Sequence, residues 1–527
     1  MKKLLFFLSI GIIAGLGSCT KSDFEESYAD PSKISATTVE KQFAGFLQTN
    51  KDFVLPAYWN YFVVLRTTLT RYTQAVGWVN TTAQYVPGAA GIDGRWGNYY
   101  GLLSQYRELE KVYNALSPED QSLRRVYMIA ATVYLYDQTQ QMIDLHGDIP
   151  FSEAGMLSTN GGDYQASLPA YDDAKSLYTK MLDDLKAFAT ELNSIVLISG
   201  IETGFKNQDF INDGSLAKWK MYTNSLRVRM LARVSDVPDF QARVASEGAE
   251  IMNNPAQFPL VTTNADNIQI TVTDLSSPIN SSGFRSGLED WDGNLAGKAM
   301  IDHMKANSDP RLRVMYQPGD SAAGVYIGLD PMLTASAQTE LVADGMIARY
   351  NWSTLSRNQY FPGILITAPE ISFFAAEAAL KGGQAAVAKA AYEDGIKKSI
   401  EFYYWLRSIS NDNSSPALVP TNATEVNNYI GSAGIKWDNA VTDADKLKLL
   451  ATQKWIHYSV VELVESWTEQ RRLDAPSFSF EVDNSNTQKL PPYRWFYSGS
   501  EQTYNTENYE AVRAKDNLST KIFWDVN

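Results

Sequence analysis

Two long stretches of the chain repeat large apolar residues every three or four positions, and this spacing constrains the possible fold more than any other feature. Within residues 95–116 the repeat comprises Trp96, Tyr99, Leu102, Leu103, Tyr106, Leu109 and Tyr113. Within residues 121–145 it comprises Leu123, Val126, Tyr127, Ala130, Ala131, Tyr134 and Leu135. Such spacing places the apolar side chains on one face of an α-helix. Because Ser117-Pro118 lies between the two stretches, we predict two antiparallel helices joined by a short connection.

Helical spacing continues along most of the remaining chain. Further helices are predicted over about 170–194, 215–234, 238–253, 369–381, 384–407 and 442–470. Alanines are concentrated in 375–379 and 385–391, on either side of Lys381-Gly382-Gly383, and they let two helices approach closely around a tight turn. This hairpin resembles a tetratricopeptide repeat, although the hairpins are not regularly spaced. The expected fold is mainly α, an irregular tetratricopeptide-like scaffold of helical hairpins.

The composition changes between about residues 254 and 368. This stretch is rich in Thr, Ser, Asn, Asp and Gly, and it contains short β-like runs at 268–272 and 364–366. Loops on a rigid scaffold commonly carry binding groups. We therefore expect one domain over residues 39–527. Its parts are a helical scaffold over about 39–253 and 369–475, a loop-rich ligand-binding insertion with short strands over about 254–368, and a closing segment over 476–527.

The single cysteine of the chain, Cys19, follows Leu16-Gly17-Ser18 at the end of an apolar run. The run begins after the positively charged Met1-Lys2-Lys3 and is too short to span a bilayer. The pattern resembles the lipobox of bacterial lipoproteins. We expect residues 1–18 to be a signal peptide and Cys19 to carry a diacylglycerol and an amide-linked acyl group such as palmitate, since two or more chains anchor a protein stably. Cleavage without lipidation is the alternative.

The residues after the cysteine are polar and acidic. Residues 19–38 include Thr20-Lys21-Ser22-Asp23-Phe24-Glu25-Glu26 and offer little to pack, so we expect a flexible tether. The tether resembles the leader that sends Bacteroidetes lipoproteins to the outer face of the outer membrane, although a solvated linker would explain it equally well. We expect a protein anchored in outer-membrane lipid through Cys19 and facing the exterior.

The net charge argues against nucleic acid as a partner. The formal charge is -14, and it becomes -16 once Lys2 and Lys3 leave with the signal peptide. A strongly acidic protein without a basic run repels a polyanion. Neutral or cationic ligands fit the charge better.

Several local strings together resemble the SusD/RagB-like family of outer-membrane nutrient-binding lipoproteins. His146-Gly147-Asp148-Ile149-Pro150-Phe151-Ser152-Glu153-Ala154 is similar to the family's Gly-Asp-Ile-Pro-Tyr-Ser-Glu-Ala string. The other strings follow in the family's order over 171–185, 218–229, 307–312, 370–379, 453–472 and 492–525. Two departures are Tyr497-Ser498, where Tyr-Pro is common, and Leu473, where Thr or Ser often stands.

The resemblance implies four tetratricopeptide-like helix pairs with a loop-rich ligand-binding half. It also implies a partner, a SusC-like TonB-dependent outer-membrane transporter that the lipoprotein covers as a lid. The family strings themselves have structural explanations. Asp148 can bond nearby amides at a helix end, and Glu465, Glu469, Arg471 and Arg472 have the spacing of a buried ion-pair network.

Signals for catalysis and for metal binding are weak. His146, His303 and His457 are isolated, and the chain contains no HExxH, Gly-x-Ser-x-Gly or P-loop motif, so we assign no catalytic residue. A pair of carboxylates could still serve a glycosidase. Calcium is the one cofactor considered, through Asp290, Asp292 and Asn294, but Ile301 stands where an EF-hand requires glutamate.

Loop aromatics beside polar residues suit carbohydrate, because a sugar ring exposes C–H bonds on its faces and hydroxyls around its rim. Four places have this character, although a Trp is more often packed than exposed to ligand. The candidate ligand residues are Trp78 with Asn80, Tyr85, Trp291 with Asn294, and Trp352 with Arg357. We expect a glycan-binding lipoprotein, not an enzyme, that passes its ligand to the transporter. The alternatives are oligopeptide capture and a surface glycosidase.

Overall fold

The computed structural model describes residues 37–527. The expected signal peptide, the lipidation site Cys19 and the tether up to residue 36 lie outside the described residues. Short helical turns include a π-helix at Trp59–Leu65. The α-helices are α3 (Val39–Thr49), α4 (Leu69–Tyr72), α5 (Ala89–Asn114), α6 (Pro118–His146), α7 (Ala174–Glu191), α8 (Ser199–Gln208), α9 (Leu216–Arg233), α10 (Gln241–Asn253), α11 (Phe284–Glu289), α12 (Lys298–Ala306), α13 (Leu312–Met315), α14 (Ala335–Ala343), α15 (Ala368–Lys381), α16 (Ala385–Ser408), α17 (Ala423–Ile430), α18 (Asp443–Tyr458), α19 (Leu463–Leu473), α20 (Gly499–Tyr504) and α21 (Thr506–Tyr509).

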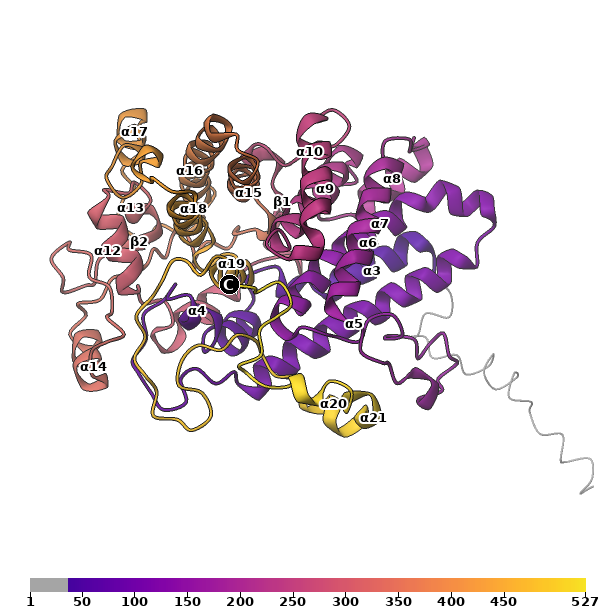
Figure 1. Cartoon of the computed structure of the whole chain (residues 1–527), viewed down its shortest axis with the longest axis horizontal. Helices are drawn as coiled ribbons and strands as arrows, with labels where there is room; N and C mark the ends of the chain where they lie inside the picture. Colours follow the sequence, from indigo (N-terminus) through magenta and orange to yellow (C-terminus); the bar gives the residue numbers. More distant parts are fainter. Residues whose placement is uncertain (1–36) are drawn as a thin grey trace, which may run out of the picture.

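The prediction of a mainly α fold is confirmed. The long helices α5 and α6 form the predicted pair, and the connection ends where the Ser117 hydroxyl accepts a hydrogen bond from the Asp120 amide and Pro118 occupies the first turn of α6. Helices α3 and α5 to α8 occupy one end of the molecule in Figure 1, and α12 to α14 occupy the other. Between them lie α15, α16, α18 and α19, so the part of the 254–368 insertion that contains α12 to α14 lies at one end, while β1 lies near the middle beside α15.

The helix predicted over 442–470 is interrupted in the structure. It forms two helices, α18 and α19, because Ser459 adopts a left-handed conformation with φ 38° and ends α18. The Ser459 hydroxyl lies 2.8 Å from the hydroxyl of Tyr350, which belongs to the insertion. A contact from a distant part of the chain therefore overrides the local helical pattern.

The insertion contains two small antiparallel sheets and four of the helices. Strand β1 (Ile268–Ile270) pairs with β4 (Gly363–Ile366), which brings together the two β-like runs of the sequence with Ile268 opposite Ile366. Strand β2 (Tyr316–Gln317) pairs with β3 (Arg349–Tyr350). Buried residues of this region, including Phe284, Met300, Tyr316 and Tyr350, share a core with Trp455 and Trp467 of α18 and α19. The insertion is thereby fixed to the scaffold.

Buried ion pairs connect helices that are far apart in sequence. The Arg233 guanidinium of α9 lies 2.6 Å from Glu469 of α19 and 3.3 Å from Asp144 of α6. The Arg472 guanidinium lies 2.6 Å from Glu469 and 2.7 Å from Glu377 of α15. Glu465 also pairs with Arg233, so both predicted glutamates belong to a buried network. Arg471 differs, because it donates to the carbonyls of Tyr493 and Asp144.

Within residues 37–527 no helix has both the length and the apolar character that crossing a membrane requires.

Candidate functional site

The π-helix at Trp59–Leu65 brings aromatic side chains to the surface of the molecule. Its widened turn is closed by the amide of Arg66, which donates to the Tyr61 carbonyl at 2.9 Å. π-Helical turns are rare and often occur at functional sites. Tyr58 and Trp59 at its start are 40% and 47% exposed. The Trp59 indole lies against α5 at Gly94, where a Cβ atom would come within 2.7 Å of its Nε1.

A stack of side chains runs from this π-helix to Trp291. The Tyr58 and Phe62 rings are stacked with centroids 5.0 Å apart. The Arg66 guanidinium lies 4.2 Å from the Phe62 centroid and 5.6 Å from that of Trp291. Because Tyr58, Phe62 and Arg66 are spaced four residues apart, they lie on one side of the turn. We call these four residues the Trp291 stack.

Trp291 is the most exposed aromatic residue of the site, with 82% of its surface accessible. It follows α11 and has a left-handed backbone with φ 57°, as does Asp292 with φ 55°. This conformation is rarely found for a bulky residue and is seen mainly where surrounding structure enforces it. The chain packs tightly directly after this turn, because a Cβ at Gly293 would lie 2.7 Å from the Leu288 carbonyl oxygen. The turn therefore holds the indole out from the surface.

Two adjoining hollows lie beside Trp291. The outer hollow has a volume of about 520 Å³ and is lined by Ser282, Arg285, Ser286, Glu289, Asp290, Trp291 and Asp292. The side hollow has a volume of about 260 Å³ and is lined by Ser282, Arg285, Ser356, Arg357, Gln359, Asn411 and Asp412. Since they share Ser282 and Arg285, they form one continuous depression. Its size falls within the range of ligand sites.

Hydrogen bonds fix the polar groups of this depression. Glu289 accepts two bonds from Arg357, both at 2.9 Å, and one from the Ser356 hydroxyl at 2.7 Å. Hydrogen bonds to the Glu289 carboxylate raise the pKa of the Arg357 guanidinium, so Arg357 stays charged. Burial alone would raise the pKa of Asp412, but hydrogen bonds from Ser353 and Ser414 hold it below its usual value. The rim thus carries fixed donors and acceptors beside an exposed aromatic face.

The structure separates the sequence candidates into buried and surface groups. Trp78 is only 7% exposed, and its indole N–H donates to Gln84 at 2.8 Å. Tyr85 is fully buried and donates to the Glu481 carbonyl at 2.9 Å, while the Asn80 amide donates to the Pro331 carbonyl at 2.8 Å. The burial of the two aromatic rings does not fit the exposed role that their loop position suggested, whereas Asn80 is half-buried.

The second group of candidates lies around the depression. Trp291 and Arg357 line it, and the Arg357 guanidinium lies 3.8 Å from the centroid of the half-buried Trp352 ring. Asn294 is buried, and its carbonyl accepts a hydrogen bond from the Tyr350 amide at 2.9 Å. It therefore supports the fold below Trp291. Among residues 37–527 no group of three or more His, Cys, Asp or Glu side chains is arranged to hold a metal ion.

Sequence reasoning did not identify the residues behind Trp291. These are Tyr58, Phe62 and Arg66 of the stack and Arg285 of the depression. The run Tyr58-Trp59-Asn60-Tyr61-Phe62 is the densest aromatic string in this part of the chain and could have drawn attention. Its association with Trp291 depends on the contact between α11 and the π-helix, where Gly287 lies against Tyr58 and Tyr61.

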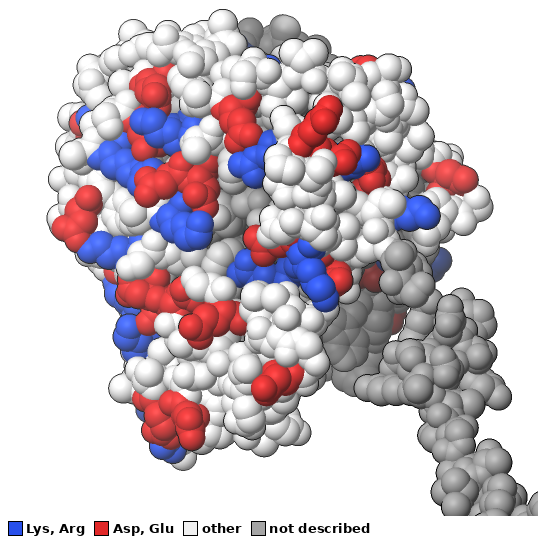
Figure 2. Space-filling model, turned by 90° about the vertical axis from the view of Figure 1, so that its right-hand side faces the viewer, with Lys and Arg blue, Asp and Glu red and all other residues white. Residues whose placement is uncertain are grey.

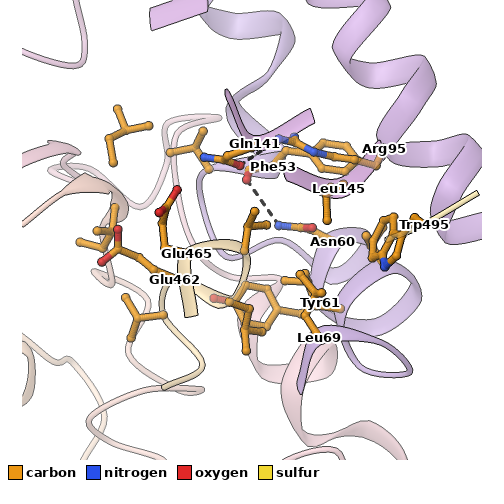
Figure 3. A pocket seen from close by; sticks show the side chains of 18 of the residues that line it. Phe53, Asn60, Tyr61, Leu69, Arg95, Gln141, Leu145, Glu462, Glu465 and Trp495 are labelled. Carbon is orange, nitrogen blue, oxygen red and sulfur yellow. Dashed lines mark hydrogen bonds between the residues drawn. The ribbon is translucent and has the colours of Figure 1, made fainter. Parts of the chain in front are cut away.

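An inner cavity of about 70 Å³ lies in the core below the π-helix (Figure 3). Glu462 and Glu465 lie on one side of it, and Arg95 and Trp495 lie on the opposite side. Burial raises the pKa of Glu462 well above its usual value, and Glu370 adds to this effect. The cavity is far smaller than ordinary ligand sites. The outer depression is therefore the better candidate for a ligand site.

The charges on the face drawn in Figure 2 are mixed. Lys and Arg side chains alternate with Asp and Glu, and no extended surface of positive charge is visible there. This face offers no footprint for a nucleic-acid backbone.

Comparisons with known proteins agree on one family. A family model described as SusD-like, "starch-binding associating with outer membrane", matches residues 46–498. A chitin-binding protein of known structure is 20% identical, with a TM-score of 0.72 over 92% of this chain and 100% of its own. A SusD homolog from Bacteroides fragilis is 19% identical, with a TM-score of 0.74 over 93% and 100% of the two chains.

A chitin-binding SusD homolog from Flavobacterium johnsoniae is 22% identical, with a TM-score of 0.70 over 93% of this chain and 99% of its own. At these identities the likeness to solved structures shows the fold. No curated protein sequence matches the chain significantly.

Proposed function

We propose that this protein, which belongs to the SusD-like family, captures a glycan at the outer membrane by stacking a sugar ring on Trp291. The family description names starch binding in association with the outer membrane. Chitin binding is named for two solved structures with the same fold. Binding in this proposal involves stacking and hydrogen bonding, with no bond made or broken in the ligand.

The exposure of Trp291 is the observation that carries the proposal. An indole that is 82% exposed forgoes the burial that usually stabilises this side chain. Its left-handed backbone adds a cost of about 1–3 kcal/mol. Such a costly arrangement is typical of residues that bind a ligand. A flat apolar face with free carboxylates at its edge matches the faces and rim of a sugar ring.

Delivery to a transporter completes the proposed role. The lipid on Cys19 would keep the protein at the outer membrane, and a SusC-like TonB-dependent transporter would receive the glycan. Family membership supports this step. Co-purification of a transporter with the lipidated protein, lost on Cys19→Ser, is the corresponding test.

Calorimetric titration tests the glycan role directly. The panel comprises oligosaccharides derived from starch, cellulose, mannan and chitin together with mixed oligopeptides, and the products of every mixture are analysed. We expect at least one oligosaccharide to bind without cleavage. Trp291→Ala should weaken that binding roughly tenfold to hundredfold, because it removes the stacking face.

A matched control separates the site from general exposure of aromatic residues. Tyr504 of α20 is 66% exposed and lies outside the depression, so Tyr504→Ala should leave the affinity within about twofold. Binding of peptides alone would instead support oligopeptide capture, and cleavage of the glycan would identify a glycosidase. Equal losses in both variants would remove Trp291 from the site.

A further inference from the structure

Two carboxylates flank the exposed ring of Trp291 without forming ion pairs. Asp290 and Asp292 line the outer hollow on either side of the indole in sequence. The third carboxylate there, Glu289, is occupied by Arg357 at 2.9 Å. No ion pair or side-chain hydrogen bond of Asp290 or Asp292 forms within residues 37–527. These two side chains are therefore free to meet a ligand.

Positive charge in the outer hollow is limited to one side chain. Arg285 is the single cation in the lining. Its guanidinium lies 3.7 Å from the Glu289 carboxylate, which partly neutralises it. Arg66 contacts the Trp291 ring as part of the stack and interacts electrostatically with Asp290, but it does not line the hollow. Arg357 is held by both oxygens of Glu289. The surface that a stacked sugar would face is consequently negative.

We propose that Asp290 and Asp292 determine charge specificity at this site, so that it accepts sugars that are uncharged or carry a protonated amine and rejects sugars that carry carboxylate or sulfate groups. The inference rests on the proposed glycan-binding function. It adds the chemical class of the glycan and the residues that select it.

Elementary electrostatics gives the direction and size of the effect. A carboxylate on a sugar stacked over Trp291 would lie several ångströms from both aspartates. Two aspartates, each about 6 Å from the carboxylate of the sugar in water, would together weaken binding roughly tenfold. An ammonium group would gain from the same carboxylates and from the exposed π face of the indole, which attracts cations. The formal charge of -14 for the chain acts in the same direction over longer range.

The test compares one glycan in two charge states. The neutral oligosaccharide that binds best in the calorimetric panel is titrated beside the same oligosaccharide with its C6 hydroxyls oxidised to carboxylates. Wild-type protein should bind the oxidised form roughly tenfold more weakly. The difference should shrink at high salt, because ions screen exposed charges.

The variant Asp290→Asn/Asp292→Asn removes both charges and keeps the shape of the turn. Asparagine is among the residues that best tolerate a left-handed backbone, which position 292 requires. In this variant the ratio of the two affinities, neutral over oxidised, should fall roughly fivefold or more relative to wild type, whatever the change in affinity for the neutral form. Thermal unfolding checks that the variant is folded.

The control variant is Asp213→Asn/Asp474→Asn. Both positions are exposed and left-handed, with φ 52° and 47°, and neither lines the depression. It removes the same net charge, so unchanged selectivity is expected. The inference is overturned if wild type binds both forms equally, or if both double variants change selectivity alike. If no oligosaccharide of the panel binds, neutral or oxidised, it is the proposed function that fails.

Discussion

At the scale of single residues, Glu462 is unusual among the buried acidic groups. Its Oε1 lies 3.7 Å from Arg229, a guanidinium already bound by Glu370 at 2.6 Å and Asp137 at 3.1 Å. Its Oε2 is buried and accepts no hydrogen bond. Four carboxylates, including Glu465 at 3.8 Å, thus surround one guanidinium. Since burial and Glu370 raise its pKa well above the usual value, Glu462 holds a proton over a pH range in which the unfolded chain has lost it.

Glu462→Gln should stabilise the protein by an amount that grows with pH. The folded pKa is raised above the unfolded one. As pH rises from about 4.5 to the folded pKa, Glu462 ionises in the unfolded chain but stays protonated in the folded protein, so the free energy of unfolding falls. Glutamine keeps the shape of the protonated acid and cannot ionise. We expect little difference near pH 4.5 and a gain of about 1 kcal/mol or more near neutrality, measured by denaturant unfolding over a pH series.

The control for Glu462 is Glu510→Gln on the surface. Its partner is Arg513 at 2.8 Å, and both side chains are more than half exposed, so the change should be small at every pH. A stability gain for Glu462→Gln that does not vary with pH would contradict the assignment of a raised pKa.

Sequence could predict Trp291 as a candidate but could not rank it above Trp78. Both are tryptophans beside polar residues in stretches without a strong helical pattern. Their difference comes from partners about 400 residues away, since Glu481 accepts from Tyr85 and Gln84 and closes the loop around Trp78. The Phe62 and Arg66 contacts to Trp291 also join residues that are far apart in sequence. Local patterns carry no information about such closures.

At the scale of elements, α15 and α16 show how small residues set a helix packing distance. A Cβ atom on Gly395 of α16 would lie 2.5 Å from the ring of Phe373 of α15. Glycine is therefore required for the two helices to approach as closely as they do. The alanine-rich pattern on either side of Gly382-Gly383 predicted this close hairpin, and the structure adds the one position where even alanine is too large.

Gly395→Ala should destabilise the protein by about 1–3 kcal/mol, because the added methyl group overpacks the helix interface. Gly248→Ala is the matched control inside helix α10. No atom lies within 4 Å of the Cβ position of Gly248, so alanine there should stabilise by about 0.5–1 kcal/mol through helix propensity. Unfolding in denaturant measures both. If both alanine variants were more stable than wild type, helix propensity and not packing would govern position 395.

Most of the long helices could be predicted from spacing, and capping residues marked the starts of several of them. The predicted 170–194 and 215–234 correspond to α7 and α9, each started by a side chain, Asp173 and Ser215, that accepts from a backbone amide. The break between α18 and α19 could not be predicted, since it depends on Tyr350 contacting Ser459. Helices in the polar 254–368 region were also missed, because α11 and α13 are too short for a period to appear.

At the scale of the whole molecule, the buried ion pairs connect helices from the N-terminal and C-terminal parts of the chain. Arg233 contacts Asp144 of α6 together with Glu465 and Glu469 of α19. The Lys454 ammonium lies 3.0 Å from Glu377 and 2.8 Å from Glu469. Helices from the first and last thirds of the chain therefore share charges in one interior, and separating them would break the pairs of Arg233 with Asp144, Glu465 and Glu469.

Arg233→Met should destabilise the whole protein by about 3–5 kcal/mol, because it leaves Asp144, Glu465 and Glu469 short of a cation in a buried place. Arg313→Met is the control, since Arg313 forms a two-point contact with Glu425 at the surface and its loss should cost about 1 kcal/mol or less. Calorimetric unfolding should retain a single transition in both variants. A small loss for Arg233→Met would show that the interior network contributes little net stability.

The exposed turn at Trp291 has a consequence for how such proteins diversify. Its side chain and the flanking aspartates point away from the hydrophobic core, while Gly293, Phe62 and Arg66 hold the turn from below. Exchanging the outward residues leaves every packed helix unchanged. A few mutations at these positions could therefore change which ligand the proposed site binds without destabilising the fold.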